Sequence, residues 1–371
     1  METIDPAAVG EAAPRTQPVA YLEFESEAAT CAALALNGFP IVHAVSIEAT
    51  EAIVSATLLL EIDGYPRCTI SRIVDGLKPG ERRNFATTML CMPLELLRGF
   101  TERQFVDIHA SLTDPHRGLL GSATLRVAIA PETHWPGIGP ACQSLATFVT
   151  PNSPDIAGLL RDVSRRLTEK TGSGALDGYL SGKTDRVQRI AESCYEAVAA
   201  LGLTYVVLQA SFEENGQKVR SADAVLGDRL GNCLDLSVLL ATVMEAAGLY
   251  PTIALGDGHA IVGFSINGEH FSDPIHRSPS LLVNRLELGE ARVVEATRLC
   301  GDPGSFADAV QTARDWLSKA SENIVVVDVK ACRLAHIHPL SEAIERNSAH
   351  SDAPVEAPTG PLHGRDRVVK R

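Results

Sequence analysis

One cysteine and one histidine in this chain stand at backbone positions that suit nucleophilic catalysis. Cys233 follows Asn232, a good helix-capping residue, and we expect a helix to begin there and to end before Gly248. His259 follows a Gly-Asp-Gly turn at residues 256–258 and heads a predicted strand. A thiol in the first turn of a helix and an imidazole at the mouth of a strand can form a thiolate and imidazolium pair, which attacks carbonyl carbons.

The thiol of Cys233 needs such a partner in order to ionise at neutral pH. An unperturbed cysteine has a pKa of about 8.5, so lowering it by two units takes about 2.7 kcal/mol. A helix N-terminus supplies only about 0.3 to 1 kcal/mol of that stabilisation. We therefore expect His259 to supply the rest. The competing interpretation is a small core cysteine and an unrelated turn histidine, in a chain with eight cysteines in all.

The residues around Cys233 and His259 resemble a known superfamily. Gly-Asn-Cys-Leu-Asp at residues 231–235, an apolar helix ending in Glu-Ala-Ala-Gly-Leu at 245–249, and Gly-His-Ala at 258–260 are similar to the core of the transglutaminase-like superfamily. Its members are papain-like enzymes with a Cys-His-Asp triad. The resemblance implies that Cys233 is the nucleophile and His259 the base of a cysteine protease or amidase. A transglutaminase is also possible.

Two carboxylates compete for the third place in the triad, where an acid orients the histidine ring. Asp273 lies fourteen residues after His259, close to the spacing usual in the superfamily. If Asn-Gly at residues 267–268 closes a two-residue hairpin turn, however, residue 273 pairs with Val262, on the face opposite to His259. Glu295 lies in Val-Val-Glu-Ala-Thr, which resembles the Val-Asp-Pro-Thr strand of the superfamily. We prefer Glu295 and keep Asp273 as the alternative.

The oxyanion that forms during acyl transfer needs hydrogen-bond donors close to the nucleophile. The backbone N–H of Cys233, at the start of its helix, is one candidate. Gln217 lies in a polar loop that approaches the predicted site, and we expect it to be the side-chain donor. The alternative is that Gln217 is simply solvated, as most loop glutamines are.

A second, narrower resemblance covers residues 40–340. This part is similar to the N-terminal region of large bacterial helicase-nuclease proteins associated with phage defence, where a β-sandwich precedes a transglutaminase-like domain. The matching stretches are Ser-Gly-Ala-Leu-Asp-Gly-Tyr at 173–179 and Gly-Gln-Lys-Val-Arg at 216–220. The resemblance implies a protein or peptide substrate, a defence-related setting and a separate helicase or nuclease partner. The competing hypothesis is a catalytically idle binding or regulatory module that recruits that partner.

Two kinds of pattern divide the chain. Residues 18–135 contain short alternating segments between turns, such as Ser-Ala-Thr-Leu-Arg-Val-Ala-Ile at 122–129, and predict an antiparallel, immunoglobulin-like β-sandwich. Residues 136–340 predict a transglutaminase-like, papain-like α+β domain with a helical lead-in. Residues 1–17 and 341–371 are rich in Ala, Pro, Ser and charged residues, and we expect both ends to be disordered.

The second region contains the elements that must position the site. Apolar residues at helical spacing predict helices at residues 155–168, 184–201, 280–288 and 306–317. Short extended patterns predict strands at residues 204–208, 252–255, 259–266, 291–297 and 323–330, with a hairpin turn at 267–268. The helix that begins at Cys233 is apolar almost all round and is expected to be buried.

The composition argues against several other functions. With 45% hydrophobic and 21% charged residues and no long apolar run, the sequence predicts a soluble chain without a membrane partner. Residues 1–18 do not resemble a signal peptide, so we expect a cytoplasmic location. The formal net charge of −13 argues against direct nucleic-acid binding. The cysteines show no zinc-ligand spacing, and we expect free thiols, no metal and no other cofactor.

Overall fold

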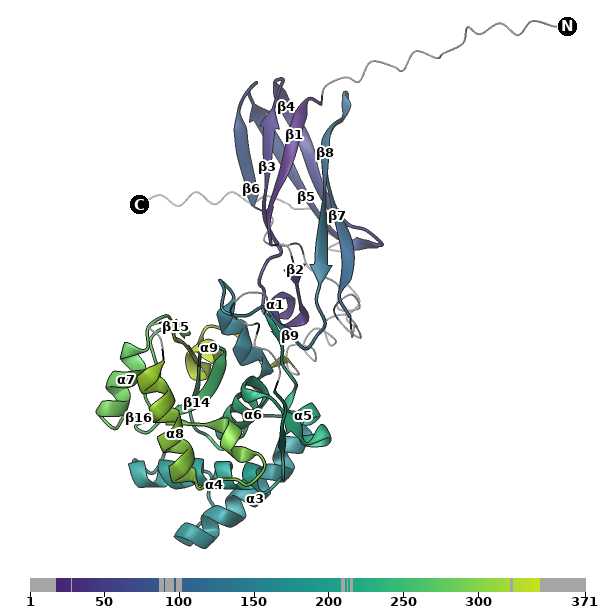
Figure 1. The fold of residues 1–371 in the computed structure, drawn as a ribbon. Coiled ribbons are helices and arrows are strands. Elements are labelled where there is room, and N and C mark those ends of the chain that lie inside the picture. Colours follow the sequence, from purple (N-terminus) through teal and green to yellow (C-terminus); the bar gives the residue numbers. More distant parts are fainter. Residues whose placement is uncertain are drawn as a thin grey trace, which may run out of the picture.

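The computed structural model describes residues 18–27, 29–86, 90, 97, 102–207, 211, 213, 216–320 and 323–340, except for the side chains of residues 66 and 67. The two ends that we predicted to be disordered, residues 1–17 and 341–371, lie outside the described residues. Helices and mainly antiparallel sheets make up the described chain, so the predicted α+β class is confirmed. Figure 1 shows a strand-rich part above a part that mixes helices with sheet.

The strand-rich part consists of two sheets with the orders β1-β3-β6 and β2-β8-β7-β4-β5. All neighbours are antiparallel except β2 and β8. The strands are β1 (Ala20–Ser26), β2 (Ala29–Thr30), β3 (Val42–Ala49), β4 (Ile53–Ile62), β5 (Tyr65–Leu77), β6 (Arg82–Ala86), β7 (Gln104–Asp114) and β8 (Gly118–Ile129). Both sheets contribute to one apolar core, for example through Val45 and Ile47 of β3 and Leu58 and Leu60 of β4.

Close main-chain contact joins the two sheets at Gly121. A Cβ atom on this residue would lie 2.2 Å from the carbonyl oxygen of Ala20, so only glycine allows β8 to approach β1 at this point. Beside it, the N–H of Val19 donates a hydrogen bond to the carbonyl oxygen of Leu120 at 3.0 Å. The sheets are therefore held together by main chain at one end as well as by packed side chains.

The second part is organised around a five-stranded antiparallel sheet with the order β15-β17-β13-β14-β16. Its strands are β13 (Pro251–Gly256), β14 (His259–Ser265), β15 (Ile275–His276), β16 (Ala291–Val294) and β17 (Val325–Asp328). Side chains alternate between two apolar clusters, as the two-residue period of a strand requires. On β13, Ile253 and Leu255 join one cluster and Ala254 joins the other, so both faces of the sheet are buried.

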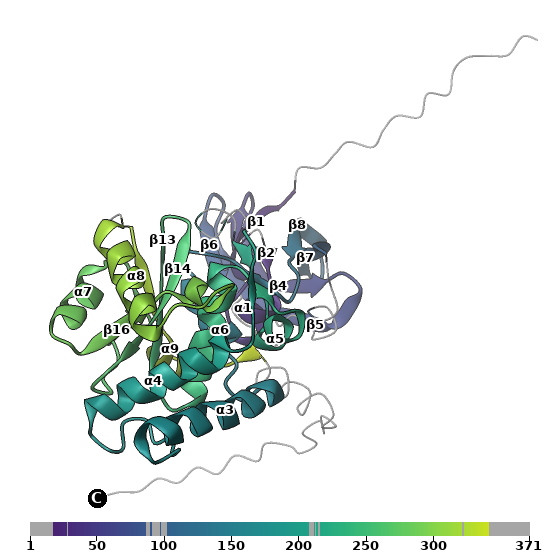
Figure 2. The ribbon, with the colours of Figure 1, turned by 60° about the horizontal axis from the view of Figure 1, so that its bottom comes forward.

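Helices cover both faces of this sheet. The helices of the described residues are α1 (Ala32–Leu36), α3 (Pro154–Thr171), α4 (Thr184–Ala199), α5 (Ala222–Asp228), α6 (Cys233–Ala246), α7 (Ser280–Glu287), α8 (Phe306–Lys319) and α9 (Val329–Leu334), with 3₁₀ segments η1 (Cys142–Phe148) and η2 (Ala296–Leu299). Of these, α6, α7, α8 and α9 contact the strands of the sheet directly. One face packs on α6, which α3, α4 and α5 contact in turn (Figure 2). On the other face, Leu282 of α7 and Leu317 of α8 join the same cluster as Val293. α6 is therefore enclosed on nearly all sides, which explains why its sequence is apolar almost all round.

Short ladders complete this part. β9 (His134–Trp135) pairs antiparallel with β11 (Gln217–Lys218), and β10 (Thr204–Tyr205) pairs parallel with β12 (Leu230–Gly231). The second ladder lies immediately before α6 and fixes an earlier segment of the chain beside the start of that helix. Within the described residues, no helix is both long enough and apolar enough to cross a membrane.

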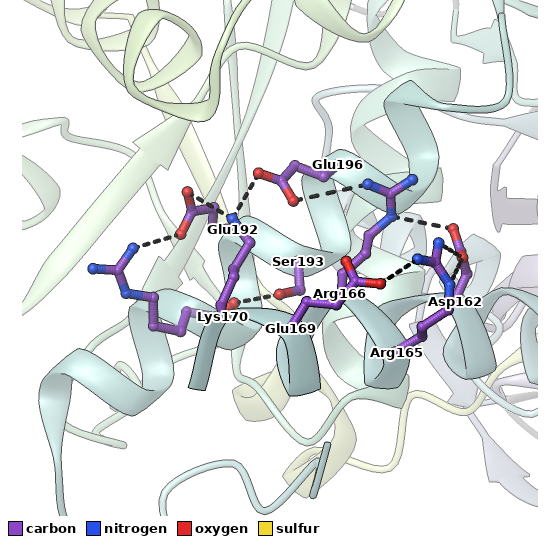
Figure 3. A network of polar contacts seen from close by, with 9 residues as sticks. Asp162, Arg165, Arg166, Glu169, Lys170, Glu192, Ser193 and Glu196 are labelled. Carbon is purple, nitrogen blue, oxygen red and sulfur yellow. Dashed lines mark hydrogen bonds and ion pairs between the residues drawn. The ribbon is translucent and has the colours of Figure 1, made fainter. Parts of the chain in front are cut away.

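α3 and α4 are joined by apolar packing and by a polar network on their outer side (Figure 3). Lys170 of α3 lies 3.0 Å from a carboxylate oxygen of Glu192 and 2.7 Å from one of Glu196, both on α4. Such half-exposed ion pairs contribute roughly 0 to 1 kcal/mol each. Buried side chains beneath them, including Val163 and Leu167, therefore provide most of the stability of the helix pair.

The chain after β14 does not follow the path that the sequence predicts. The predicted hairpin turn at residues 267–268 is wrong, because β14 ends at Ser265 and the next strand, β15, pairs with β17. Both sides of β14 are already hydrogen-bonded, to β13 and to β16, so no free edge remains for a strand folding back on it. Instead, the Gly268 N–H donates to the Ser265 hydroxyl at 3.0 Å and the chain turns away.

Two predicted strands are shorter than expected, because an acidic side chain begins a helical turn at the end of each. The strand predicted at residues 291–297 ends at Val294, and Glu295 caps η2. The strand predicted at residues 323–330 ends at Asp328, which caps α9. A capping carboxylate satisfies free N–H groups at a helix start, so it competes with continued strand pairing.

Candidate active site

A reciprocal cap fixes the N-terminus of α6, where Cys233 lies. The Asn232 side chain accepts a hydrogen bond from the Asp235 N–H at 2.9 Å, and the Asp235 carboxylate accepts one from the Asn232 N–H at 3.1 Å. One turn beyond Cys233, the Ser237 hydroxyl donates to the carbonyl oxygen of Ala260 at 3.2 Å. The start of α6 is therefore held against the start of β14.

The Asp235 carboxylate also anchors the segment that leads into α5. It is fully buried, and it accepts hydrogen bonds from the Arg220 N–H at 2.8 Å and from the Arg220 guanidinium at 2.7 Å. A buried carboxylate is tolerated only when its oxygens are paired, so these contacts keep Asp235 in its capping position. Asp235 thus supports the helix that carries Cys233.

A tight turn presents His259 at the start of β14, as the sequence predicted. Gly256 pairs with His259 across the β13–β14 hairpin, and the residues between them have positive φ angles, 50° at Asp257 and 70° at Gly258. Two successive positive φ values characterise a type I′ turn, which suits the twist of antiparallel strands. The Glu213 carboxylate accepts a hydrogen bond from the Gly258 N–H at 3.0 Å and so braces the turn from outside.

Glu295 meets the ring of His259. Its Oε2 lies 2.8 Å from Nε2 of His259. Val294 of β16 pairs with Val262 of β14, and both His259 and Glu295 are an odd number of residues from that pair. Their side chains therefore leave the sheet on the same face, which is the register that brings the acid to the ring.

The carboxylate of Glu295 is held from its other side as well. It is 3% exposed, and its Oε1 accepts hydrogen bonds from the N–H of Thr297 at 3.0 Å and from the Thr297 hydroxyl at 2.7 Å. Burial acts to raise the pKa of Glu295, but the hydrogen bond and positive charge of His259, with the Thr297 contacts, outweigh it and lower the pKa. Glu295 is therefore ionised at neutral pH.

The His259 ring is held as a cation between Cys233 and Glu295. Burial acts to lower its pKa, but hydrogen bonding and charge interactions with Cys233 and Glu295 outweigh it and raise the pKa to about 10. Because Nε2 faces Glu295, Nδ1 is the ring nitrogen left for Cys233. The structure thus brings Cys233, His259 and Glu295 together in a continuous chain of contacts.

Other cysteines have a different environment. Burial raises the pKa of Cys31 to about 11, of Cys142 to about 12 and of Cys300 to about 11. No histidine contributes to these three shifts, so each of these thiols stays protonated at neutral pH. Free thiols among the described cysteines include Cys31, Cys142, Cys194, Cys233, Cys300 and Cys332.

A pocket of about 440 Å³ opens beside the His259 ring. Its wall also includes Tyr205, Thr297 and Cys300. Cys233 is only 6% exposed and does not itself line this pocket, but Tyr205 and His259, which both interact with its side chain, do. A pocket of this volume has room for part of a peptide or for a small molecule.

Two aromatic residues at the site were missed by the sequence reasoning. The Tyr205 hydroxyl contacts the Cys233 side chain, and burial together with this contact raises the pKa of Tyr205. Tyr205 is placed there by its pairing with Gly231, two residues before Cys233. The ring of Trp316, on α8, stands edge-on to that of His259 with the centroids 5.4 Å apart. Neither residue belongs to a local motif, so only the folded chain reveals them.

Asp273 does not lie beside His259. It is exposed, and its carboxylate accepts a hydrogen bond from the Ser272 hydroxyl at 3.0 Å. It directly precedes the segment that enters β15, and β17 and β13 separate β15 from β14. Asp273 was the alternative prediction for the acid partner of His259, and that prediction is wrong, because the chain after β14 crosses to the far edge of the sheet.

Gln217 also makes contacts other than those predicted. It is buried in β11, where it pairs with Trp135, and its side-chain oxygen accepts a hydrogen bond from the Ser211 N–H at 3.3 Å. Among the described residues, no hydrogen bond joins Gln217 to Cys233. The predicted oxyanion role of Gln217 therefore has no support in the geometry.

Metal ligands converge on one point, whereas the residues of this site contact one another in sequence. Each group contacts the next, and both ring nitrogens of His259 face protein partners, Glu295 and Cys233. Across the described part of the chain, no three His, Cys, Asp or Glu side chains are grouped so as to hold a metal ion.

Comparison with known proteins adds little to this geometry. No family model matches the chain, and no curated protein matches it. A solved structure of a candidate protease from Parabacteroides distasonis is similar at 12% identity, over 70% of this chain and 46% of that chain, with a TM-score of 0.21. The match spans less than half of that protein, and a TM-score this low carries no argument about fold or function.

Proposed function

We propose that this protein catalyses cysteine-dependent acyl transfer with water as the acceptor, as a peptidase or amidase. The observation that carries the proposal is the contact chain from Cys233 through His259 to buried Glu295, with the pKa of His259 raised to about 10. Burying two charged groups costs desolvation free energy, so a pair of this kind is uncommon where packing is the only requirement. Strongly shifted ionisation beside a pocket is typical of catalytic groups.

In the proposed reaction, the Cys233 thiolate attacks the carbonyl carbon of a peptide or side-chain amide, and an electron pair moves to the oxygen. The tetrahedral intermediate collapses as His259 gives its proton to the amine nitrogen and the C–N bond breaks. Water then attacks the thioester, its proton passes to His259, and the C–S bond breaks to release the carboxylic acid. Glu295 orients the ring and stabilises its cationic form throughout. An amine in place of water would give a transglutaminase.

The donors proposed for the oxyanion are the Cys233 N–H and the Tyr205 hydroxyl. The first N–H groups of a helix have no partner within it, and the Tyr205 hydroxyl already contacts the Cys233 side chain. Tyr205 thus takes the role that we expected of Gln217. Tyr205→Phe should lower kcat by roughly 10²-fold while KM stays unchanged, because the donor acts on charge that develops only in the transition state. An unchanged kcat would contradict this role.

The finer fold assignment and the biological setting belong to the same proposal. An immunoglobulin-like sandwich followed by a papain-like domain is supported by the common core of the two N-terminal sheets and by a cysteine-bearing helix packed on an antiparallel sheet. A helicase or nuclease partner and a defence-related setting rest on the sequence resemblance alone.

Alkylation by iodoacetamide across pH tests the proposal. The rate at the Cys233 peptide, followed by mass spectrometry, should be near its plateau already at pH 6 to 7, because an imidazolium keeps the thiolate populated. The shape of the profile is the measurement, since burial of Cys233 slows the rate at every pH. Cys300→Ala is the matched control, because it removes the thiol that lines the pocket beside His259 and should leave the profile of Cys233 unchanged.

A different alkylation profile would contradict the proposal. A rate at Cys233 that climbs only around pH 8.5, as for a free thiol, would exclude the proposed chemistry. It would leave the competing hypothesis, a catalytically idle module that binds or regulates a partner.

A further inference from the structure

A second pocket lies where the strand-rich part meets the helix-rich part. Its volume is about 330 Å³, and it is lined by residues from the β1–β3 region, by residues 136–141 and by Glu213. That volume is near the lower limit for small-ligand sites and has room for one long side chain. None of Cys233, His259 and Glu295 lines it, so it is separate from the pocket beside the imidazole.

The walls of this junction pocket are apolar and its charged groups are acidic. The apolar lining comes from Leu34, Phe39, Pro40, Ile41, Ile138 and Pro140. The polar groups include the carboxylates of Glu27 and Glu213, and Nε2 of His43 lies 3.3 Å from a Glu27 oxygen. Among the described lining residues there is no lysine or arginine. The pocket therefore offers a ligand apolar surface and negative charge together.

One protein cation approaches the pocket from outside. The Arg277 guanidinium donates to the carbonyl oxygen of Gly139 at 2.8 Å, and Gly139 is part of the wall. Arg277 itself is not a lining residue. Within the described residues, Glu213 makes no ion pair, so a cation inside the pocket would find its carboxylate uncompensated.

Glu213 connects the junction pocket to the candidate active site. One of its oxygens accepts the hydrogen bond from the Gly258 N–H at 3.0 Å, and Gly258 directly precedes His259. The second oxygen remains available to a ligand, because a carboxylate accepts several hydrogen bonds. A group bound against Glu213 therefore lies beside the turn that carries His259, because Glu213 is hydrogen-bonded to the residue before it.

We propose that the junction pocket binds the side chain of a lysine or arginine residue of the peptide substrate. Such a side chain has a long apolar stem and a cationic end, which match the apolar walls and the two carboxylates. The assignment to a substrate rests on the proposed cysteine chemistry, whereas the binding of a cationic side chain does not. A basic residue held beside Glu213 would position its peptide next to His259 and so determine which bonds are attacked.

Binding to the Cys233→Ala protein, which cannot turn substrate over, tests the proposal. The probes are Nα-acetyl-lysine amide and Nα-acetyl-norleucine amide, which differ in the ammonium group. By saturation-transfer NMR titration, we expect the lysine probe to bind about tenfold more tightly, the effect of two modest charge contacts. The preference should weaken as salt concentration rises.

Isosteric variants separate charge from shape. Glu27→Gln combined with Glu213→Gln removes both charges but keeps acceptors for His43 and for the Gly258 N–H, so the preference for the lysine probe should disappear. Glu25→Gln combined with Glu48→Gln is the matched control, since it removes the same charge from exposed positions on β1 and β3 outside the pocket. The control should keep the tenfold preference.

Two results would overturn the assignment: equal binding of the two probes, or a lysine preference that survives in the Glu27 and Glu213 double variant. The cysteine chemistry is judged separately by the alkylation profile of the protein with Cys233 intact. A chain that prefers the lysine probe but whose thiol behaves as a free one would keep the cation site and lose the proposed reaction. A chain with a reactive thiol but no preference for the lysine probe would keep the proposed reaction and lose the cation site.

Discussion

A histidine and an acidic residue lie close together near each edge of the five-stranded sheet. Only the pair near the β16 edge, His259 and Glu295, forms a chain of contacts with a cysteine. Beside β16, Oε2 of Glu295 lies 2.8 Å from Nε2 of His259. At β15, Nε2 of His276 lies 3.0 Å from the carbonyl oxygen of Asp273 and not from its carboxylate. Both rings also contact an aromatic side chain, so ring packing does not distinguish the two ends.

The difference lies in how each carboxylate is held. Glu295 is buried and its other oxygen accepts two hydrogen bonds from Thr297, whereas Asp273 is exposed and its side chain is bonded to the neighbouring Ser272 hydroxyl. A buried, ionised acid keeps an adjacent imidazole protonated, while an exposed one is screened by water. A histidine and an acidic residue close together are therefore not enough to make such a pair. The acid must be desolvated and fixed by further donors.

The largest expected effect comes from the histidines. His259→Ala should slow iodoacetamide alkylation of Cys233 at pH 6 on the order of 100-fold, because a free thiol is only about 0.3% ionised at that pH. His276→Ala, at the other end of the sheet, should leave the rate unchanged. Mass spectrometry of the Cys233 peptide gives both rates. A loss of similar size in the two variants would mean that general disturbance of the sheet, and not the imidazolium, controls the thiol.

The second prediction concerns stability and pH. The pKa of His259 is raised from 6.5 to about 10 in the folded chain, so its stabilising contribution is fully present below pH 6.5 and is lost as pH rises through about 10. The free energy of unfolding of wild type relative to His259→Gln should therefore fall by roughly 1 to 4 kcal/mol over that range. Urea denaturation at pH 6.5 and 10 measures it. His276→Gln is the control, and an identical pH trend in both variants would contradict the assignment.

The sequence predicted the positions of Cys233 and His259 from local signals, whereas the choice of Glu295 depended on a longer-range argument. Asn232 and its neighbours predicted the helix start at Cys233, and the Gly-Asp-Gly turn predicted His259 at a strand mouth, because caps and turns depend on local chemistry. Glu295 was preferred over Asp273 partly on the premise of a hairpin at residues 267–268 that does not form. The choice agrees with the geometry although part of its reasoning was wrong.

The residues that sequence reasoning missed depend on non-local pairing. Tyr205 reaches Cys233 because a two-residue strand pairs parallel with Leu230–Gly231, and no local pattern indicates so short a ladder. The path of the chain after β14 depends on which edges of the sheet are free, and that is decided by β16 and β17, which come later in the sequence. Local propensities contain neither kind of information.

The third prediction compares the two carboxylates directly. Glu295→Gln keeps an acceptor for the His259 ring but removes the charge, so alkylation of Cys233 at pH 6 should slow by about tenfold, the effect of one pKa unit. Asp273→Asn should have no effect, because its carboxylate does not contact the ring. Rates measured side by side at the Cys233 peptide decide the point. An effect of Asp273→Asn equal to that of Glu295→Gln would remove the distinction between the two ends of the sheet.

The smallest expected effect tests whether the donors behind the acid matter. Thr297→Val removes the hydroxyl that donates to Oε1 of Glu295 at 2.7 Å and keeps the shape of the side chain and its N–H. One charge-assisted hydrogen bond acts only indirectly on Cys233, so its alkylation rate at pH 6 should fall by about two- to threefold. Ser272→Ala removes the corresponding donor to Asp273 and should change nothing. In a Glu295→Gln background, Thr297→Val should lose its effect, since it acts through the charge of that carboxylate. An undiminished effect there would show that Thr297 influences the thiol by another route.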